Sequence, residues 1–267
     1  MTSEKDYFKA NEALWDAKTP THVKSAFYNQ EAFMNGETSL RKLELAELPY
    51  VRGKKLLHTQ CHFGQDTLSL QRMGAQCTGV DFSGVALEKA REMNDALGLS
   101  ARFLRTNIYD LDKVDNSLYD MVFTSYGVIT WLPDLERWAA QLMARLSQGG
   151  EFLMVEFHPV IYMLDWDKAT FAYRYFNDGS PYEEEEEGTY ADPSAVIRKK
   201  EYFWQHPLSD VMSALMLHGL EVTSFKEYDY SPYDVFPGSA HRAEQEYCYS
   251  VNGITLPHVF SLKGTKK

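Results

Sequence analysis

Short apolar runs alternate with stretches of helical periodicity from residue 54 to residue 150 of the chain. Strands that alternate with helices in this way are typical of a parallel sheet with crossover helices. The runs that we interpret as the first five strands are residues 54–59, 76–80, 101–106, 119–124 and 151–157. The pattern therefore predicts an α/β fold.

The segment after the second strand shows the helical pattern clearly. Ser83 is a suitable N-cap and Gly98 a suitable stop. Apolar residues between them recur at steps of four, three and four on one face: Ala86, Ala90, Met93 and Leu97. We expect this face to pack on the sheet.

The remaining segments are expected to complete a single domain of residues 1–267. Residues 1–50 carry a helical leucine pattern and predict an N-terminal cap on the core, which spans residues 51–157. Residues 207–267 resume the regular pattern, with a helix that starts at Pro207. Two strands are expected in this last part, at residues 220–228 and 259–263.

Residues 158–206 break the regular pattern, because they are aromatic and acidic and have no sustained period. We interpret this segment as an insertion or lid, since it leaves the sheet where a cleft would open. The glutamate run at residues 183–187 is expected to be a solvated loop within it.

Composition narrows the function. The 27 Lys and Arg residues against 38 Asp and Glu residues give a formal net charge of −11, which repels phosphate backbones and anionic membranes. No stretch reaches the roughly 18 apolar residues of a membrane span. The three cysteines match neither a disulfide framework nor a zinc site, so we expect a cytoplasmic protein without a metal. From the charge and the lack of a long apolar stretch, we expect neither a nucleic acid nor a membrane as partner.

Ligands of open parallel sheets bind beyond the carboxyl ends of the strands, so the residues after each strand are the informative ones. The turn after the first strand contains Gly64, which we expect to let the backbone approach a ligand closely. Asp81 ends the second strand at a spacing from Gly64 typical of an acid that binds ribose hydroxyls. Asn107 follows the third strand and Tyr126 the fourth.

Together, residues 57–66 and 78–83 make the segment from Leu56 to Trp131 resemble a bacterial branch of the class I S-adenosylmethionine-dependent methyltransferases. The resemblance implies a Rossmann-like, doubly wound, seven-stranded and mostly parallel sheet with an antiparallel last strand. It also implies S-adenosylmethionine as cofactor.

The resemblance assigns cofactor contacts residue by residue. The turn with Gln60, His62 and Gly64 would cradle the methionine part, and Asp81 would hold the ribose. The residues assigned to the adenine and to the amino-acid end are Phe82, Asn107, Ile108, Ser125 and Tyr126. The N-terminal residues expected to close over the cofactor are Trp15, His22 and Tyr28.

The chain departs from the usual motif of this family at two places. His58, Gln60 and His62 stand where an acid and two glycines are common, so the usual carboxylate near the cofactor ammonium is missing. The acid that commonly follows the third strand is Asn107 here, which keeps a hydrogen-bond acceptor without the charge.

Candidate acid–base residues lie at the cleft ends of the fourth and fifth strands: Tyr126, Glu156 and His158. His158 is the favoured base because an unperturbed imidazole has a pKa of about 6.5 and can accept a proton around neutral pH. Glu156 would orient the acceptor or hold the cofactor ammonium instead. We therefore expect methyl transfer to a small-molecule acceptor, whose identity and reacting atom stay open together with the oligomeric state.

Two other functions stay open at this point. A nicotinamide-dependent oxidoreductase also needs a glycine-rich turn and an acid after the second strand, but Gln60 and His62 would crowd its pyrophosphate. A non-catalytic protein that binds S-adenosylmethionine or a nucleoside could have kept the fold while its first motif changed.

Overall fold

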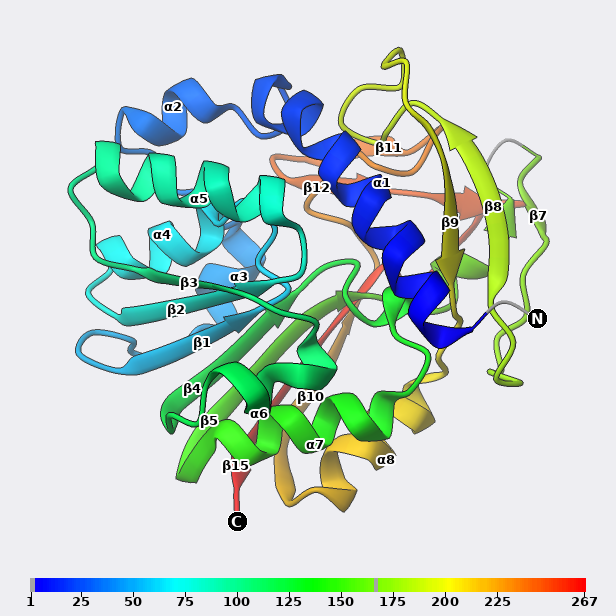
Figure 1. Cartoon of the computed structure of the whole chain (residues 1–267). Helices are drawn as coiled ribbons and strands as arrows, with labels where there is room; N and C mark the ends of the chain where they lie inside the picture. The colour runs from blue at the N-terminus through cyan, green and yellow to red at the C-terminus, as the bar shows by residue number, and fades with distance from the viewer. Residues whose placement is uncertain (1–2, 166–167) are drawn as a thin grey trace.

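Seven strands form one central sheet with helices on both faces in the computed structural model, which describes residues 3–165 and 168–267 (Figure 1). The strands are β1 (Lys55–Thr59), β2 (Gln76–Asp81), β3 (Arg102–Arg105), β4 (Tyr119–Ser125), β5 (Leu146–Phe157), β10 (Leu220–Tyr228) and β15 (Val259–Lys266). Their spatial order is β10-β15-β5-β4-β1-β2-β3. Only β15 runs antiparallel to its neighbours in this sheet, so the predicted fold is confirmed.

The helices are α1 (Glu4–Lys24), α2 (Gln30–Met34), α3 (Lys42–Glu47), α4 (Gln65–Arg72), α5 (Gly84–Ala96), α6 (Leu111–Val114), α7 (Leu135–Arg145) and α8 (Leu208–Leu217). Ser83 caps α5, as predicted, and accepts a hydrogen bond from the Ala86 N–H at 3.1 Å. One buried cluster, around Trp138 and Phe152, joins α7 and α8 to the sheet. A second cluster, around Leu68 and Leu87, joins α4 and α5 to the opposite face.

The insertion contains short strands rather than an irregular loop. They are β6 (Leu164–Asp165), β7 (Thr170–Phe171), β8 (Tyr182–Glu187) and β9 (Arg198–Phe203). The prediction of a solvated loop at residues 183–187 is wrong, because these residues form β8 and pair with β9. Basic side chains of β9 offset the acidic ones, with Lys200 bound to Glu183 and Arg198 at 3.2 Å from Glu185.

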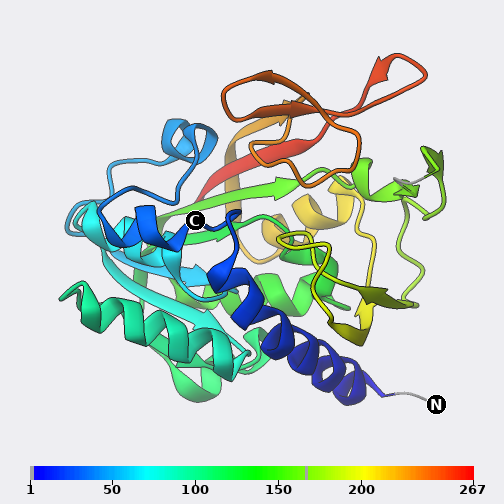
Figure 2. The same ribbon diagram turned by 90° about the horizontal axis from the view of Figure 1, so that it is seen from above.

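Two hairpins between β10 and β15 were not predicted. They consist of β11 (Ala240–Ala243) with β12 (Glu246–Cys248), and β13 (Ser250–Val251) with β14 (Ile254–Thr255). Figure 2 shows this part of the chain, in orange, as a layer separate from the helices. In Figure 1 the long strands point toward α1 and these hairpins, so the carboxyl edge of the sheet is the covered one.

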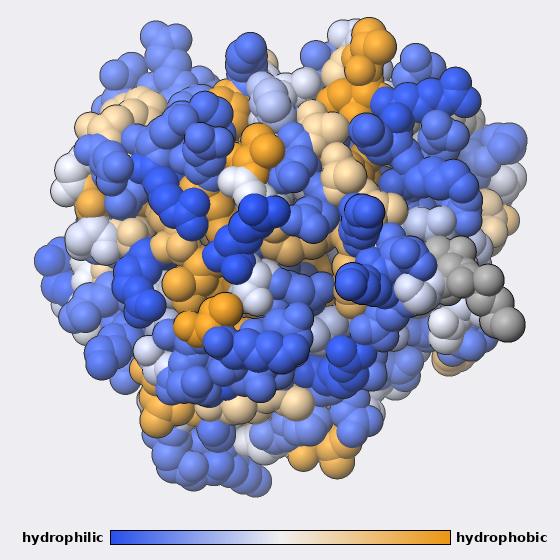
Figure 3. All heavy atoms as spheres, viewed as in Figure 1, coloured by the Kyte–Doolittle hydropathy of each residue, from blue (hydrophilic) through white to orange (hydrophobic). Residues whose placement is uncertain are grey.

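The surface of the molecule carries mostly hydrophilic residues on the face seen in Figure 3, with apolar side chains in limited areas. Within the described part of the chain, no helix combines the length and the apolar character needed to cross a bilayer.

Candidate active site

The turn after β1 has backbone angles typical of glycine at two positions that are not glycine. Gln60 and His62 both have φ at 51°, in the left-handed region that non-glycine residues seldom adopt. Contacts to neighbouring strands hold this shape, because the His62 N–H donates to Asp81 Oδ2 at 2.8 Å and the Cys61 N–H donates to the Val80 carbonyl at 2.9 Å. The departures from the family motif therefore change side chains while the path of the turn is retained.

Gly64 is the N-cap residue of α4 and has φ at 80°. A Cβ atom on this residue would lie 2.8 Å from the Phe103 ring and 3.0 Å from the Ala90 Cβ. The glycine thus makes room for β3 and α5 of the protein's own core. The expected close approach of a ligand to Gly64 stays a prediction.

Asp81 joins the end of β2 to the turn. Its Oδ2 accepts from the His62 N–H and its Oδ1 accepts from the Ser83 N–H at 2.9 Å. Asp81 is 6% exposed, and burial raises the pKa of its carboxyl group to about 6 against the opposing effect of these two donors. A carboxylate offers about four lone-pair sites, so both oxygens can still accept from ribose hydroxyls.

The residues assigned to the adenine lie at the ends of the adjacent strands β2 and β3. Asn107 Oδ1 accepts from the Tyr109 N–H at 3.1 Å and caps the short 3₁₀ helix Ile108–Asp110. Ile108 is buried in the core cluster, and Phe82 is partly exposed. Asn107 thus has a structural role as a cap beside its predicted role in recognition.

Glu156 holds the loop after β4. Its side chain is fully buried, and its oxygens accept from the backbone N–H groups of Gly127, Val128, Ile129 and Phe157. Burial raises its pKa, although these donors act in the opposite direction. This carboxyl group therefore positions the backbone that follows Tyr126, and its predicted role beside the acceptor stays a prediction.

His158 is buried at the end of β5. Its Nε2 lies 2.8 Å from Glu227 Oε1, and its Nδ1 accepts from the Val160 N–H at 3.1 Å. Burial lowers the pKa of the imidazole, while Glu227 opposes that shift. Since both ring nitrogens are engaged, His158 would have to exchange a partner to act as a base, and its catalytic role stays a prediction.

The N-terminal helix α1 packs over the turn after β1. The Trp15 ring lies 5.2 Å from the His62 ring and 5.5 Å from the Trp131 ring. His22 Nδ1 is 3.0 Å from His62 Nε2, and its Nε2 is 2.5 Å from Thr189 Oγ1 of the insertion. His62 therefore links the turn to α1, and His22 links α1 to the insertion.

Sequence reasoning missed the acidic residues of α1 and α3. Asp16 Oδ1 accepts from Ser83 Oγ at 2.6 Å and from the Val85 N–H at 3.2 Å, so α1 helps to cap α5. Glu44 is fully buried in α3 near Tyr126. No local sequence signal marked either residue, because each is brought to the site by contacts far apart in the chain.

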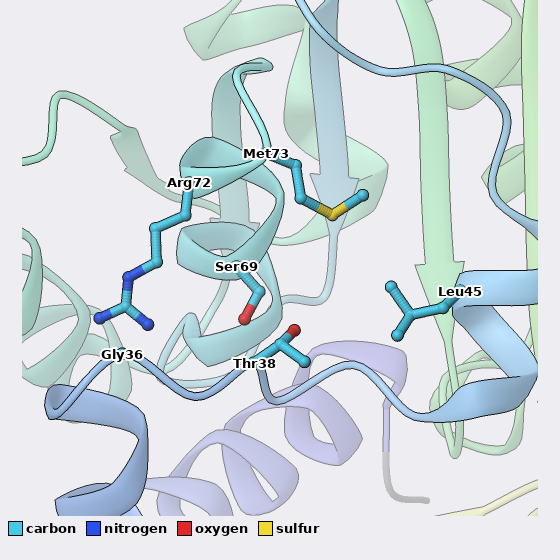
Figure 4. A pocket seen from close by; sticks show the side chains of 6 residues that line it. All are labelled: Gly36, Thr38, Leu45, Ser69, Arg72 and Met73. Carbon is cyan, nitrogen blue, oxygen red and sulfur yellow. The ribbon is translucent and has the colours of Figure 1, made fainter.

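A separate hollow lies between the loop before α3 and the second half of α4 (Figure 4). Its lining includes Leu45, Arg72 and Met73, and it is distant from the turn because α4 begins at the carboxyl edge and runs away from it. Among residues 3–165 and 168–267, no group of three His, Cys, Asp or Glu side chains could hold a metal ion.

Comparison with known proteins agrees with this geometry. Residues 57–150 match a family model described as a methyltransferase domain, and they contain the turn, Asp81, Asn107 and Tyr126. Residues 57–150 of this chain form a methyltransferase domain. No curated protein matches the chain.

Solved structures share its fold at low identity. An S-adenosylmethionine dependent methyltransferase from Mesorhizobium loti is 18% identical, with 87% of this chain and 100% of that chain covered and a TM-score of 0.56. A SAM-dependent methyltransferase from Methanosarcina mazei is 17% identical, with coverages of 85% and 98% and a TM-score of 0.57. The magnesium protoporphyrin IX methyltransferase of Synechocystis PCC 6803, with bound SAH, is 11% identical, with coverages of 95% and 100% and a TM-score of 0.51.

The sheet also separates this methyltransferase from the oxidoreductase alternative. Dinucleotide-binding sheets of that kind are built from two parallel halves in the order 3-2-1-4-5-6. Here β15 is inserted antiparallel between β5 and β10. The Mesorhizobium loti and Methanosarcina mazei proteins that share this fold are described as methyltransferases that depend on S-adenosylmethionine.

Proposed function

We propose that this methyltransferase transfers the methyl group of S-adenosylmethionine to a small molecule enclosed beneath α1 and the insertion. The observation that carries the proposal is the cover over the carboxyl edge. Asn11 of α1 makes two hydrogen bonds to the backbone of Tyr202, at 2.8 Å and 2.9 Å, and Lys18 pairs with Glu201 at 3.5 Å in a buried position. An acceptor that reaches the turn must fit beneath these elements.

The residues at the carboxyl edge fit the cofactor. Gln60 Oε1 is buried without a hydrogen-bond partner among the described residues, so the turn has an acceptor to offer to a donor group. Asp81 and Asn107 stand at the ends of adjacent strands, where a ribose and an adenine need acceptors. When bound, S-adenosylmethionine supplies a methyl group already activated by its sulfonium.

The chain's own residues then have to align an acceptor and exclude water. Glu156 sets the loop that carries Tyr126, and Trp15 and His22 cover the turn. Residues 158–206, apart from 166 and 167, which lie outside the described residues, act as the lid in this proposal. The enclosure and the net charge of −11 both favour a small acceptor over a nucleic acid.

Calorimetry of the purified protein with S-adenosylmethionine, S-adenosylhomocysteine and NADH tests this function. We expect binding of both sulfur compounds and none of NADH, followed by methyl incorporation from labelled S-adenosylmethionine when a metabolite extract is added. Binding of NADH alone would support the oxidoreductase alternative. Binding of S-adenosylmethionine without labelling of any small molecule would support the non-catalytic alternative.

A further inference from the structure

A series of hydrogen bonds over the turn after β1 has a fixed direction. We use the name donor chain for His62, His22 and Thr189. The Phe63 N–H donates to His62 Nδ1 at 2.7 Å, and a backbone N–H can only donate. His62 Nδ1 is therefore the acceptor nitrogen of that ring. A neutral His62 then carries its hydrogen on Nε2, which lies 3.0 Å from His22 Nδ1.

The same reasoning extends the donor chain into the insertion. Because His22 Nδ1 accepts from His62, a neutral His22 carries its hydrogen on Nε2 and donates it to Thr189 Oγ1 at 2.5 Å. Both imidazoles are neutral around pH 7, since burial lowers the pKa of His22 to about 3 and holds the pKa of His62 well below its usual value. Hydrogen bonds that run in one direction polarise one another, so the hydroxyl of Thr189 becomes a stronger donor.

Thr189 has a hydrogen left to donate at the end of the donor chain. Its oxygen accepts from His22, but its own hydroxyl hydrogen has no acceptor among residues 3–165 and 168–267. Thr189 is 7% exposed, and buried polar groups usually have their hydrogen-bonding capacity filled. The hydrogen is therefore free for an acceptor atom of a ligand.

A second free hydroxyl hydrogen lies beside the donor chain. The Tyr28 and Tyr190 hydroxyl oxygens are 2.5 Å apart, and only one of the two hydroxyls can donate in this contact. The other hydroxyl hydrogen has no acceptor within the described part of the chain. The Tyr28 and Tyr190 rings lie 5.4 Å and 4.8 Å from the His22 ring, so both unused hydrogens belong to groups around one imidazole.

The charge around the donor chain favours a singly charged anion. After burial, the cation Lys18 is the group that lowers the pKa of His22, which places positive potential at this ring. Lys18 is itself paired with Glu201 at 3.5 Å, so its charge is partly offset. The unused donors are neutral hydroxyl groups. They suit the single charge of a carboxylate better than the nearly double charge of a phosphate monoester.

We propose that the donor chain binds a carboxylate group of the methyl acceptor through the Thr189 hydroxyl, with the Tyr28–Tyr190 pair as the second donor. This inference rests on the proposed function. Thr189 and Tyr190 belong to the insertion, and His22 and Tyr28 belong to the N-terminal part. All four lie outside residues 57–150, which match the methyltransferase domain. Segments outside a shared domain are the ones expected to differ with the acceptor.

The test compares 3-phenylpropanoate with its neutral analogue 3-phenylpropanamide in ligand-observed NMR titrations, at pH 7 in HEPES buffer with S-adenosylhomocysteine present. The two probes have nearly the same shape, but the amide turns hydrogens of its own toward the donors. We expect the parent to bind the carboxylate roughly tenfold more tightly than the amide. Thr189→Val should reduce this ratio by roughly fivefold or more, and Thr189→Ser, which keeps a hydroxyl, should retain it.

The matched control is Thr19→Val. Thr19 is buried in α1, and its hydroxyl donates to the Trp15 carbonyl at 2.7 Å. This variant loses a hydroxyl close to the donor chain without changing its end, so it should keep the ratio of the parent. Tyr190→Phe leaves the Tyr28 hydroxyl free to donate and should reduce the ratio less than Thr189→Val does.

Three results would overturn the inference. Equal binding of the two probes by the parent would mean that solvent takes these hydrogens, and a ratio that survives Thr189→Val would exclude Thr189. A loss of S-adenosylhomocysteine affinity in Thr189→Val but not in Thr189→Ser, with both variants folded by circular dichroism, would assign the donor chain to the carboxylate of the cofactor. Calorimetry of the parent with S-adenosylhomocysteine comes first. A parent that does not bind it refutes the proposed function separately, and the probe ratio measured without it still tests the donor chain.

Discussion

Gly53 and Gly64 share a φ of 80° but have different surroundings. A Cβ on Gly53 would meet no atom within 4 Å, whereas one on Gly64 would meet Phe103 and Ala90. Both alanine variants carry the strain of a left-handed residue, and Gly64→Ala also overpacks the core. We expect urea unfolding to show Gly64→Ala about 1–3 kcal/mol less stable than Gly53→Ala. Equal stabilities would mean that the turn is displaced from β3 and α5.

Asp81 is the residue on which ribose recognition depends in our proposal. An Asp81→Asn side chain places an amide NH₂ against one of two backbone donors, from His62 or Ser83, and offers fewer acceptor sites. S-adenosylmethionine binding should weaken by about 1.5–3 kcal/mol, or roughly ten- to a hundredfold, in calorimetry. Asp95→Asn, an exposed change on α5, is the control. Unchanged affinity would remove Asp81 from the ribose.

Glu44 should make the stability of the ligand-free protein depend on pH. Its pKa is raised from 4.5 to about 8 on folding, so the folded state binds more protons than the unfolded state between these values. Stability from this group is present below pH 4.5 and is lost as the pH rises toward 8, at about 1.4 kcal/mol per pH unit at most. Glu44→Gln stays neutral, so urea unfolding from pH 5 to 8 should show a flatter profile. Parallel profiles would contradict the burial of an ionisable Glu44.

At the scale of elements, the join between α1 and β9 depends on one buried side chain. Asn11 bonds both the N–H and the carbonyl of Tyr202, so Asn11→Ala leaves two buried backbone groups without these partners. We expect a loss of about 1–3 kcal/mol and faster proteolysis within α1. The control is Asn116→Ala, which removes one exposed hydrogen bond to Asp112. If the two variants resist protease equally, α1 is held by other contacts.

The strands of the sheet were predictable because their signal is local. Apolar runs closed by turn residues place β1, β2, β4 and β10 within a residue or so of their observed bounds. β8 was not predictable from its glutamates, since the charges that offset them lie on β9 across a connection of ten residues, 188–197. The proposed role of the insertion as a lid likewise depends on its contacts with α1, which the hydrophobic pattern of the sequence does not indicate.

The same distinction holds for the site. Asp81, Asn107 and Tyr126 follow strands directly, so the topology of a parallel sheet places them at one edge. The surroundings of Glu44 depend on the approach of α3 to residues 66 and 126, which the sequence does not indicate. The hydrogen bonds of Glu156 and His158 also required the structure, because both residues occupy positions where either a catalytic or a structural role is expected.

At the scale of the whole molecule, binding of the cofactor should reduce the mobility of α1 and the insertion. His22 connects the turn to Thr189, so a ligand on the turn should steady α1 and the insertion together. We expect S-adenosylhomocysteine to slow amide hydrogen exchange in residues 182–203. Exchange in α8, which packs on the other side of the core, should be unchanged and serves as the internal control. Equal exchange in residues 182–203 with and without the ligand would argue against a lid.

The position of β15 has a consequence for synthesis of the chain. β10 is made before β15 but reaches β5 only through it, because β15 lies between them in the sheet. A nascent chain that stops before residue 259 therefore contains β5 and β10 without β15. Each of these strands then has unpaired backbone groups along the edge that β15 would occupy. Exposed edges of this kind recruit strands from other molecules. Chain fragments that end between Tyr228 and Val259 are therefore expected to be prone to aggregation.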